Sequence, residues 1–172
     1  VILMAKAFPQ SHFVGIDISP EAIDEARQQV RRQKIENLDF LVLDAADLKN
    51  KMEMEGLFDY VTAFDAIHDQ TRPLDVLRGV NHILTPDGRF SMVDIAANSN
   101  LADNLAHPMG PFLYTVSLMH CLPVGLVGGG TGLGMMWGRE KAVEMLKDAG
   151  FQRVQVLEMA DDPFNLHFFC CK

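Results

Sequence analysis

The chain has 172 residues, 48% hydrophobic and 22% charged, which is typical of a soluble globular protein with a core of its own. Its 15 Lys and Arg residues against 23 Asp and Glu residues give a net charge of −8, which argues against a nucleic-acid partner. The three cysteines are odd in number and lack the spacing of a metal knuckle, so we expect reduced thiols, no metal and a cytoplasmic location.

The first predicted elements alternate between helix and strand. Residues 1–8 have the pattern of a helix end, and because the chain starts inside this pattern we expect its start to be a fragment boundary. Residues 13–17 predict a strand, Ser19 is a good helix cap, and Pro20 suits the first turn of the helix that follows. Residues 38–43 form a near-continuous apolar run, which predicts a strand buried on both faces.

The next elements continue this alternation. Residues 58–64 predict another buried strand, and Pro73 opens an amphipathic helix. The sequence Pro86-Asp87-Gly88 predicts a turn before a strand over residues 89–95. Strands that alternate with helices imply parallel strands joined by right-handed crossovers.

Residues 97–137 depart from this pattern, and residues 104–138 contain no Asp, Glu, Lys or Arg. Prolines and eight of the 13 glycines interrupt the uncharged stretch, which argues against a membrane-spanning helix. We therefore expect no membrane partner, and we expect this segment to cover a small-molecule pocket or to form the interface of a homodimer. Residues 111–122 within it predict a helix.

The last elements reverse the direction of the chain. Residues 139–149 predict a helix that ends at Gly150, and residues 154–158 and 164–170 predict two strands. The connection between these strands is too short for a crossover, so the final strand must be antiparallel. The predicted fold class is therefore α/β, with a doubly wound, mostly parallel sheet and an antiparallel last strand.

An acid follows each of the first two predicted strands. Asp17 ends the first, and Asp44 follows the second. In open α/β sheets ligands bind at the carboxyl ends of the strands, where a carboxylate accepts hydrogen bonds from ribose hydroxyls. Asp44 can accept from an exocyclic amine while the backbone N–H of Ala45 donates to a ring nitrogen. Asp17 alone fits a plain helix-entry acid equally well, but the pair predicts an adenosine ligand.

Five short motifs follow one another in a fixed order. They are VGIDISP at 14–20, LDAADL at 43–48, FDYV at 58–61, LTPDGR at 84–89 and AGF at 149–151. Together they resemble the class I methyltransferases that use S-adenosyl-L-methionine (SAM) on small molecules. The resemblance implies a Rossmann-like methyltransferase domain over residues 1–172, with 97–137 as an insertion over the acceptor pocket. The family's first strand and its glycine-rich loop are missing, which implies an N-terminally truncated domain, and Asp87 replaces a common glycine.

The resemblance also implies SAM as the cofactor and methyl transfer to a small, mostly apolar acceptor. The implied cofactor contacts are Asp17, Ile18, Asp44, Ala45, Phe64 and Asp65. The first two would contact the ribose and the adenine, the next two would hold the adenine edge, and the last two would lie near the methionine end.

His68 is the candidate catalytic residue. It stands with Asp69 after the third predicted strand, where O-methyltransferases of small phenolic molecules carry a His-Asp pair that supplies a general base. A histidine at this position can remove the proton from an acceptor hydroxyl. The alternative is a histidine that only shapes the pocket or caps the next helix.

Four polar or aromatic residues are candidates for lining the acceptor pocket, because they lie in or beside the uncharged segment. They are Asn98, Tyr114, His120 and Trp137. Their mostly apolar surroundings suit an apolar acceptor, since small-molecule pockets are largely apolar with a few polar groups.

The glycine run at 128–134, followed by Glu158, comes close to the spacing of a dinucleotide-binding fingerprint. Pro123 and Gly125 spoil the strand that should precede it, and bulky residues stand where the helix should open. We therefore expect a flexible loop over the acceptor pocket.

Two alternative functions stay open at this point. A truncated, non-catalytic module would keep the methyltransferase fold without holding SAM well, and its exposed strand edges would favour association. An NAD-dependent oxidoreductase would use Asp17 in the same ribose-binding role, but Asp44 and the antiparallel last strand argue against it.

Overall fold

The structure, a computed structural model, describes residues 1–172 without a gap, and the chain folds as two compact units. Unit 1 comprises Val1–Asp47 and unit 2 comprises Leu48–Lys172. That residues 1–172 act as a single domain stays a prediction. No helix in the structure combines the length and the apolar composition needed to cross a membrane.

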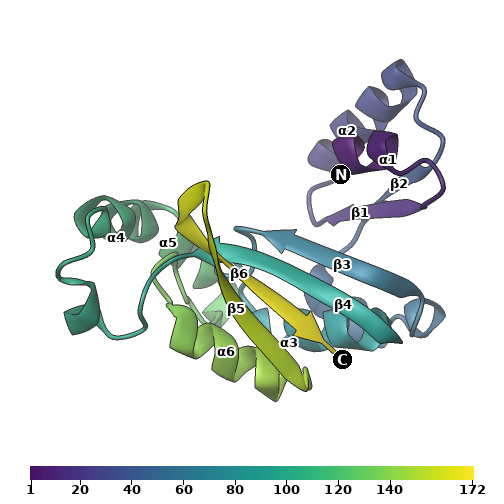
Figure 1. Cartoon of the computed structure of the whole chain (residues 1–172). Coiled ribbons are helices and arrows are strands. Elements are labelled where there is room, and N and C mark those ends of the chain that lie inside the picture. The colour runs from purple at the N-terminus through teal and green to yellow at the C-terminus, as the bar shows by residue number, and fades with distance from the viewer. The chain divides into compact units, whose positions relative to one another are not determined.

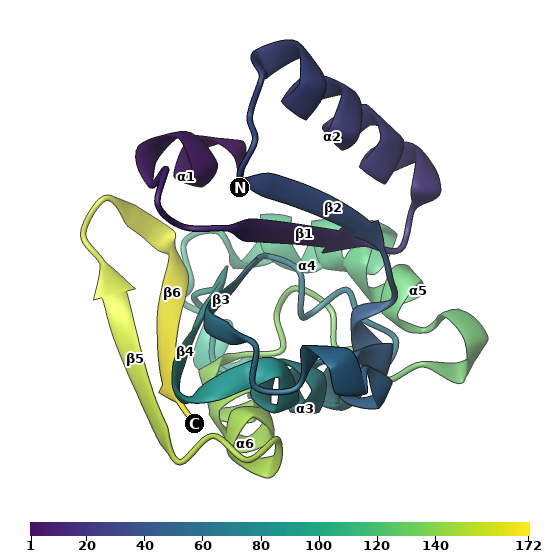
Figure 2. The same ribbon diagram turned by 90° about the vertical axis from the view of Figure 1, so that its right-hand side faces the viewer.

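Unit 1 is a two-stranded parallel sheet with a helix packed on it (Figure 2). Its elements are, in chain order, α1 (Ile2–Ala7), β1 (Phe13–Asp17), α2 (Pro20–Gln33) and β2 (Leu38–Val42). The register of the strands begins with Phe13 opposite Leu38, and α2 packs against both strands. Ser19 caps α2 as predicted, because its Oγ accepts the Ala22 N–H at 3.2 Å.

Unit 2 contains the larger sheet and the remaining helices (Figure 1). The short 3-10 helix η1 (Ala45–Asn50) spans the unit boundary. The elements after it are η2 (Met52–Met54), β3 (Phe58–Phe64), α3 (Pro73–Ile83), β4 (Leu84–Ile95), η3 (Leu101–Asn104), α4 (Gly110–Met119), α5 (Cys121–Gly125), η4 (Val127–Gly129), α6 (Arg139–Asp148), β5 (Arg153–Met159) and β6 (Asp162–Cys171), where η denotes a 3-10 helix.

The strand order in unit 2 is β3-β4-β6-β5. Strands β3 and β4 are parallel, whereas β6 is antiparallel to both β4 and β5. The last strand is therefore the one reversed strand, inserted between two strands that share a direction. This confirms the predicted α/β class with a mostly parallel sheet and an antiparallel last strand.

Helices α3 and α6 lie together on one face of this sheet (Figure 1). The register places Phe90 opposite Cys170 and Met92 opposite Phe168, and all four side chains are fully buried. Because alternate residues of a strand face opposite sides, Asp94 lies on the same side of β4 as Phe90 and Met92. The core of unit 2 thus fixes the position of an acid at the carboxyl end of β4.

Strands β2 and β3 are less buried than predicted. Leu41 and Val42 of β2 are exposed, as are Tyr60 and Phe64 of β3. Both strands have a single hydrogen-bonded neighbour, β1 for β2 and β4 for β3. An apolar run alone does not distinguish such an edge strand from a central strand that is covered on both faces.

Two local predictions need correction. The turn expected at residues 86–88 lies inside β4 as a register shift, since Phe58 pairs with Leu84 while Tyr60 pairs with Arg89. The helix expected over residues 111–122 is divided at His120 into α4 and α5. In the first case a predicted turn lies inside a continuous strand. In the second case one predicted helix is divided into two.

Candidate active site

His68 lies in the loop after β3, and its side chain is only 2% exposed. Its Nδ1 lies 2.7 Å from Oδ1 of Asp94, a residue of β4 that is itself 1% exposed. Asp69, the expected partner, lies on the opposite side of the ring, with 3.5 Å between His68 Nε2 and Asp69 Oδ1. The structure therefore keeps Asp69 beside His68, as the sequence order suggests, and adds Asp94 as the hydrogen-bond partner on the other ring nitrogen.

The environment of Asp94 determines the tautomer of His68. Besides the His68 ring, Asp94 Oδ1 receives the backbone N–H of Ile95 at 2.9 Å and the indole N–H of Trp137 at 3.1 Å. An oxygen that accepts from two obligate donors behaves as a carboxylate acceptor, so His68 must donate through Nδ1. Nε2 then carries the lone pair of the neutral ring.

Three carboxylates act on the pKa of His68. Burial favours the neutral ring, but the hydrogen bond with Asp94 and the charges of Asp94, Asp69 and Asp65 outweigh it and raise the pKa of His68. The pKa of Asp65 is also raised, by its own burial and by the charge of Asp94. The site therefore holds a concentration of negative charge that favours a proton on the imidazole.

The Nε2 side of His68 faces two further side chains. Asp69 Oδ1 is buried and has no hydrogen-bond partner, and Cys121 at the start of α5 is buried beside it. Burial and the neighbouring Asp69 raise the pKa of the Cys121 thiol to about 11. Candidate donor atoms of His68, Asp69 and Cys121 lie within 4.8 Å of one another, close enough to hold a small ligand or a metal ion.

The expected adenosine contacts of unit 1 lie at the carboxyl end of the β1-β2 sheet. Asp17 ends β1, and its Oδ1 accepts the Ser19 N–H at 2.8 Å. Ile18 follows with 68% of its surface exposed. Asp44 follows β2, and its Oδ1 accepts the Ala46 N–H at 2.9 Å. Both acids thus help to shape their own turns, as the helix-entry alternative for Asp17 required.

The expected methionine-end contacts lie in unit 2 at the carboxyl end of β3. Phe64 is 60% exposed. Asp65 has a φ of 46°, in the left-handed region that residues other than glycine seldom adopt. Such a conformation costs free energy and occurs often at functional sites, where the surrounding structure imposes it. Here the Asp65 N–H donates to Val93 O at 2.9 Å, which holds the turn against β4.

The four expected acceptor residues do not form one group. Trp137 is buried and donates to Asp94, so it helps to hold the acid that contacts His68. Asn98 and Tyr114 both contact Asn104, which receives the Asn98 N–H at 2.9 Å and donates to Tyr114 Oη at 3.0 Å. His120 is exposed at the junction of α4 and α5 and joins neither cluster.

Sequence reasoning missed three residues of these clusters. Asp94 gave a partial signal, since it is an acid near the carboxyl end of the strand predicted over residues 89–95. Asn104 and Cys121 gave none, because a single amide or thiol in an uncharged segment is most often a core residue. Only the tertiary structure identifies their partners.

The glycine run is an ordered connection that leads to Trp137. Thr131 N–H donates to Thr71 O at 2.9 Å, and Met135 N–H donates to Ser117 Oγ at 3.0 Å. The run follows the helical turn η4 rather than a strand, and α6 begins only at Arg139. The dinucleotide alternative is therefore wrong, and the expected flexible loop is instead fastened to the loop that follows His68.

Gly134→Ala is expected to destabilise the protein by about 1–3 kcal/mol. Gly134 has a φ of 69°, and a Cβ there would lie 2.5 Å from Ser117 Oγ. Gly128→Ala is the matched control, because Gly128 has a φ of 62° but nothing within 4 Å of the added atom. Urea unfolding should show a larger loss for Gly134→Ala, and equal losses would contradict the tight packing of this segment.

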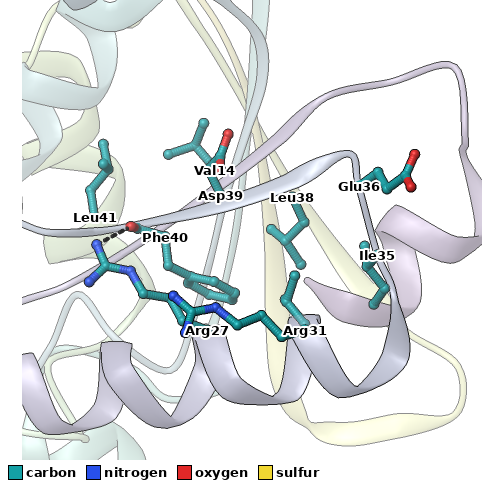
Figure 3. Close-up of a pocket in the computed structure, with 10 residues that line it drawn as sticks. Val14, Arg27, Arg31, Ile35, Glu36, Leu38, Asp39, Phe40 and Leu41 are labelled. Carbon is teal, nitrogen blue, oxygen red and sulfur yellow. Dashed lines mark hydrogen bonds between the residues drawn. The ribbon is translucent and has the colours of Figure 1, made fainter.

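Two surface hollows lie outside this cluster. The one in unit 1 measures about 590 Å³ and lies between α2 and β2, where Arg27 Nη2 donates to Phe40 O at 2.8 Å (Figure 3). The one in unit 2 measures about 680 Å³ and lies beside the β5-β6 turn, with Asn98 and Arg139 in its lining. Neither hollow is lined by His68 or Asp17.

Comparison with known proteins identifies a family. A family model described as a methyltransferase domain matches residues 1–150. Demethylmenaquinone methyltransferase of Listeria welshimeri is 24% identical over 97% of this chain and 71% of its own length. PigF, solved with SAH, superposes with a TM-score of 0.73 at 18% identity over 99% of this chain and 46% of its own.

A second solved structure supports the same fold. An O-methyltransferase family protein from Burkholderia thailandensis has a TM-score of 0.72 at 17% identity, over 98% of this chain and 47% of its own. The chain thus spans about half the length of the solved structures it matches. At such identities these structures show the fold alone.

Proposed function

Because the chain belongs to the methyltransferase domain family, we propose that it transfers the methyl group of SAM to a hydroxyl of a small, mostly apolar molecule, with His68 as the general base. The observation that carries this proposal is the buried hydrogen bond of 2.7 Å between His68 Nδ1 and Asp94. It fixes the ring so that Nε2 is the nitrogen left to accept a proton from the acceptor.

The residues of unit 1 fit the adenosine part of SAM. Asp17 uses one carboxylate oxygen for the Ser19 N–H, and its other oxygen can accept from the ribose hydroxyls. Ile18 presents an exposed apolar surface for the adenine ring. Asp44 and the Ala45 N–H are assigned to the adenine edge, at the same end of the parallel sheet.

In unit 2, Phe64 and Asp65 are assigned to the methionine part of SAM. The exposed ring of Phe64 and the constrained backbone of Asp65 support this assignment. When bound, SAM supplies a methyl group on a positively charged sulfur, and that sulfur keeps the bonding electrons when the methyl leaves. The pKa of Asp65 is raised by burial and by the charge of Asp94, and in its ionised form this carboxyl group suits a positively charged donor group.

His68 and Asp94 manage the proton of the acceptor. His68 Nε2 removes the hydroxyl proton, and the imidazolium that forms is stabilised by Asp94 through Nδ1. Asp94 remains a carboxylate throughout, held by the N–H groups of Ile95 and Trp137. Burial of His68 at 2% exposure excludes bulk water from the ring, which strengthens its electrostatic interaction with Asp94.

The acceptor site is assigned to the segment that follows β4. The buried cluster of Ile95, Ala97, Leu113 and Met136 packs with Tyr114 and supports an apolar acceptor. Asn98, Tyr114 and Trp137 are its polar or aromatic lining. His120 is exposed, so it belongs to this site only if an acceptor reaches the surface at the α4-α5 junction.

The strand edges and the net charge bear on the partners of the chain. Strands β1 and β3 each have one unpaired edge, and unpaired edges favour pairing with a second copy, so we assign a homodimer. The net charge of −8 supports a small-molecule partner rather than nucleic acid. A cytoplasmic location stays a prediction from the cysteine content.

Asp17→Asn is expected to weaken SAM binding about 10-fold or more. The substitution removes the charged oxygen that accepts from the ribose hydroxyls and can place the NH2 group of the amide there instead. The amide oxygen can still accept the Ser19 N–H, so the turn survives. Isothermal titration calorimetry with SAM measures the change, and Glu25→Ala on the exposed side of α2 is the control. Equal SAM affinity in wild type and Asp17→Asn would contradict the ribose assignment.

The same titration with NAD separates the remaining alternatives. The proposal predicts binding of SAM and none of NAD. NAD binding without SAM binding would overturn the methyltransferase function. SAM binding without turnover of any acceptor would favour a non-catalytic module.

A further inference from the structure

The side chains of α4, α5 and η4 expose a large apolar surface. Of the 20 large hydrophobic side chains that are exposed in the whole chain, eight lie between residues 101 and 127. Helices α4 and α5 pack against each other at one end of unit 2, beyond the end of its sheet (Figure 1). A concentration of exposed apolar side chains marks an interaction site. We call this patch the α4-η4 surface, and its six members are 39–78% exposed: Phe112, Leu118, Met119, Val124, Leu126 and Val127.

Helix α4 is apolar on both of its faces. On the inner face, Leu113 is 5% exposed and packs with Ile95 and Met136 in the buried cluster assigned to the acceptor. On the outer face, Phe112 and Leu118 are 58% and 66% exposed. A helix that is hydrophobic all round is normally buried all round, so the outer face of α4 calls for a partner. The inner face thus serves the acceptor site, and the outer face is left for a second molecule.

We propose that two copies of this chain pair through the α4-η4 surface; this inference rests on the homodimer of the proposed function and names the surface that holds it together. No Asp, Glu, Lys or Arg occurs from residue 104 to residue 138, and 25 of these 35 residues are at least partly exposed. A stable interface takes roughly 20–30 residues from each partner and has few charged residues at its centre. One uncharged segment therefore supplies enough surface for one side of such an interface.

The distribution of charge favours a second copy over other partners. Two copies that each carry a net charge of −8 repel one another, so they associate best through a surface without charge. In a two-fold interface each patch faces its own copy, and a charged side chain near the axis would meet an identical charge.

Other partners fit the α4-η4 surface less well. Helices that lie on a lipid surface carry Lys and Arg on their polar face, and these residues are absent here, while a net charge of −8 is repelled by anionic lipids. A different protein is commonly selected through complementary charges, which this surface does not offer. A second copy therefore matches the surface best.

Leu118→Glu tests the surface directly. The new carboxylate would be buried without a partner on both sides of the interface, so the dissociation constant of the dimer should rise about 100-fold or more. Met52→Glu is the matched control, because Met52 is 69% exposed and lies outside the α4-η4 surface. Sedimentation velocity over a series of concentrations measures the dissociation constants, and circular dichroism shows whether each variant is folded. Equal dissociation constants for wild type and a folded Leu118→Glu protein would overturn the inference.

Methionine oxidation gives a second test that needs no substitution. In the single chain Met119 and Met52 are exposed to a similar extent, 78% and 69%. Oxidation of methionine follows the exposure of its sulfur, so in lipid-free, dimeric wild-type protein Met119 should be oxidised by hydrogen peroxide about 3-fold or more slowly than Met52. Mass spectrometry of the peptides measures both rates. Equal rates in the dimer would overturn the inference, whether or not Leu118→Glu folds.

The possible results separate this inference from the proposed function. A wild-type protein that stays monomeric at every concentration overturns both the homodimer and its interface, and flotation of that monomer with phosphatidylcholine vesicles would assign the α4-η4 surface to lipid instead. A dimer that survives Leu118→Glu leaves the homodimer to the strand edges and overturns the α4-η4 interface. A dimer that responds as expected but methylates no acceptor overturns the proposed chemistry alone.

Discussion

Replacing His68 by glutamine is expected to lower kcat for a phenolic acceptor about 10²- to 10⁴-fold, the usual contribution of a positioned general base. The loss should appear in kcat, because the proton is transferred only on the way to the transition state. SAM affinity should change little, since His68 is not among the residues assigned to SAM, which are Asp17, Ile18, Asp44, Ala45, Phe64 and Asp65. Steady-state kinetics at saturating SAM and acceptor, together with SAM calorimetry, measure both quantities.

Glutamine is preferred to alanine at this position because its amide can still donate to Asp94, whose Oδ1 is buried with three donors around it. His12→Ala is the control, because His12 is exposed and pairs with Asp39 at 3.0 Å on the surface of unit 1. Unchanged kcat in a folded His68→Gln protein would mean that His68 only shapes the pocket, which is the alternative left open by the sequence.

Asp94→Asn is expected to lower kcat about 100-fold and to shift the acidic limb of the kcat/KM profile toward lower pH. Asparagine keeps an acceptor for Trp137 and Ile95, but it removes the charge that stabilises the imidazolium of His68. The new amide group also falls where Oδ2 has no hydrogen-bond partner, which adds a cost in stability. Without the Asp94 charge, the neutral His68 ring is a weaker base.

The direction of the pH shift follows from the groups around His68. A general base must be neutral, so kcat/KM falls as the pH drops below the pKa of His68. Asp94, Asp69 and Asp65 raise that pKa above the ordinary 6.5, against burial, so the acidic limb of the wild-type profile lies above pH 6.5. Without the Asp94 charge, the effect of burial is opposed less strongly, so the pKa of His68 falls and the acidic limb moves to lower pH. Cys121 keeps its proton over this range, with a pKa of about 11.

Profiles of kcat/KM between about pH 5 and pH 9 test this shift, since histidine titrates within that range. Asp87→Asn is the matched control, because Asp87 is an exposed carboxylate on the same strand. An acidic limb that stays in place or moves to higher pH in Asp94→Asn would contradict the assignment of Asp94 as the residue that positions and charges His68.

The sequence predicted the strands of this protein well, because their ends are marked by local chemistry. The bounds predicted for β1 and β3 match the structure, since each run of apolar residues is closed by an acid or a turn. The short connection before the last strand correctly required an antiparallel strand. What the pattern could not show was how many neighbours each strand has, and for this reason the burial of β2 and β3 was overestimated.

The candidate site was predictable only in part, because its partners come from distant parts of the chain. His68 was found from its place after a strand, but its hydrogen-bond partner lies 26 residues further on. Trp137 was found as a candidate for the acceptor pocket, but nothing in the sequence indicated its hydrogen bond to Asp94, 43 residues away in the sequence. Pairings of this kind depend on the sheet register and on loop packing, which short motifs do not encode.

Methyl transfer with His68 as the base is tested most directly by incubating the chain with SAM that carries a deuterated methyl group and with a phenolic acceptor, followed by mass spectrometry of the acceptor. We expect the wild-type chain to give an aryl ether that carries the deuterated methyl group, and His68→Gln to give about 10²-fold less or lower at the same time point. A wild-type chain that binds SAM yet labels no acceptor, or a His68→Gln chain that labels it equally fast, would contradict methyl transfer with His68 as the base.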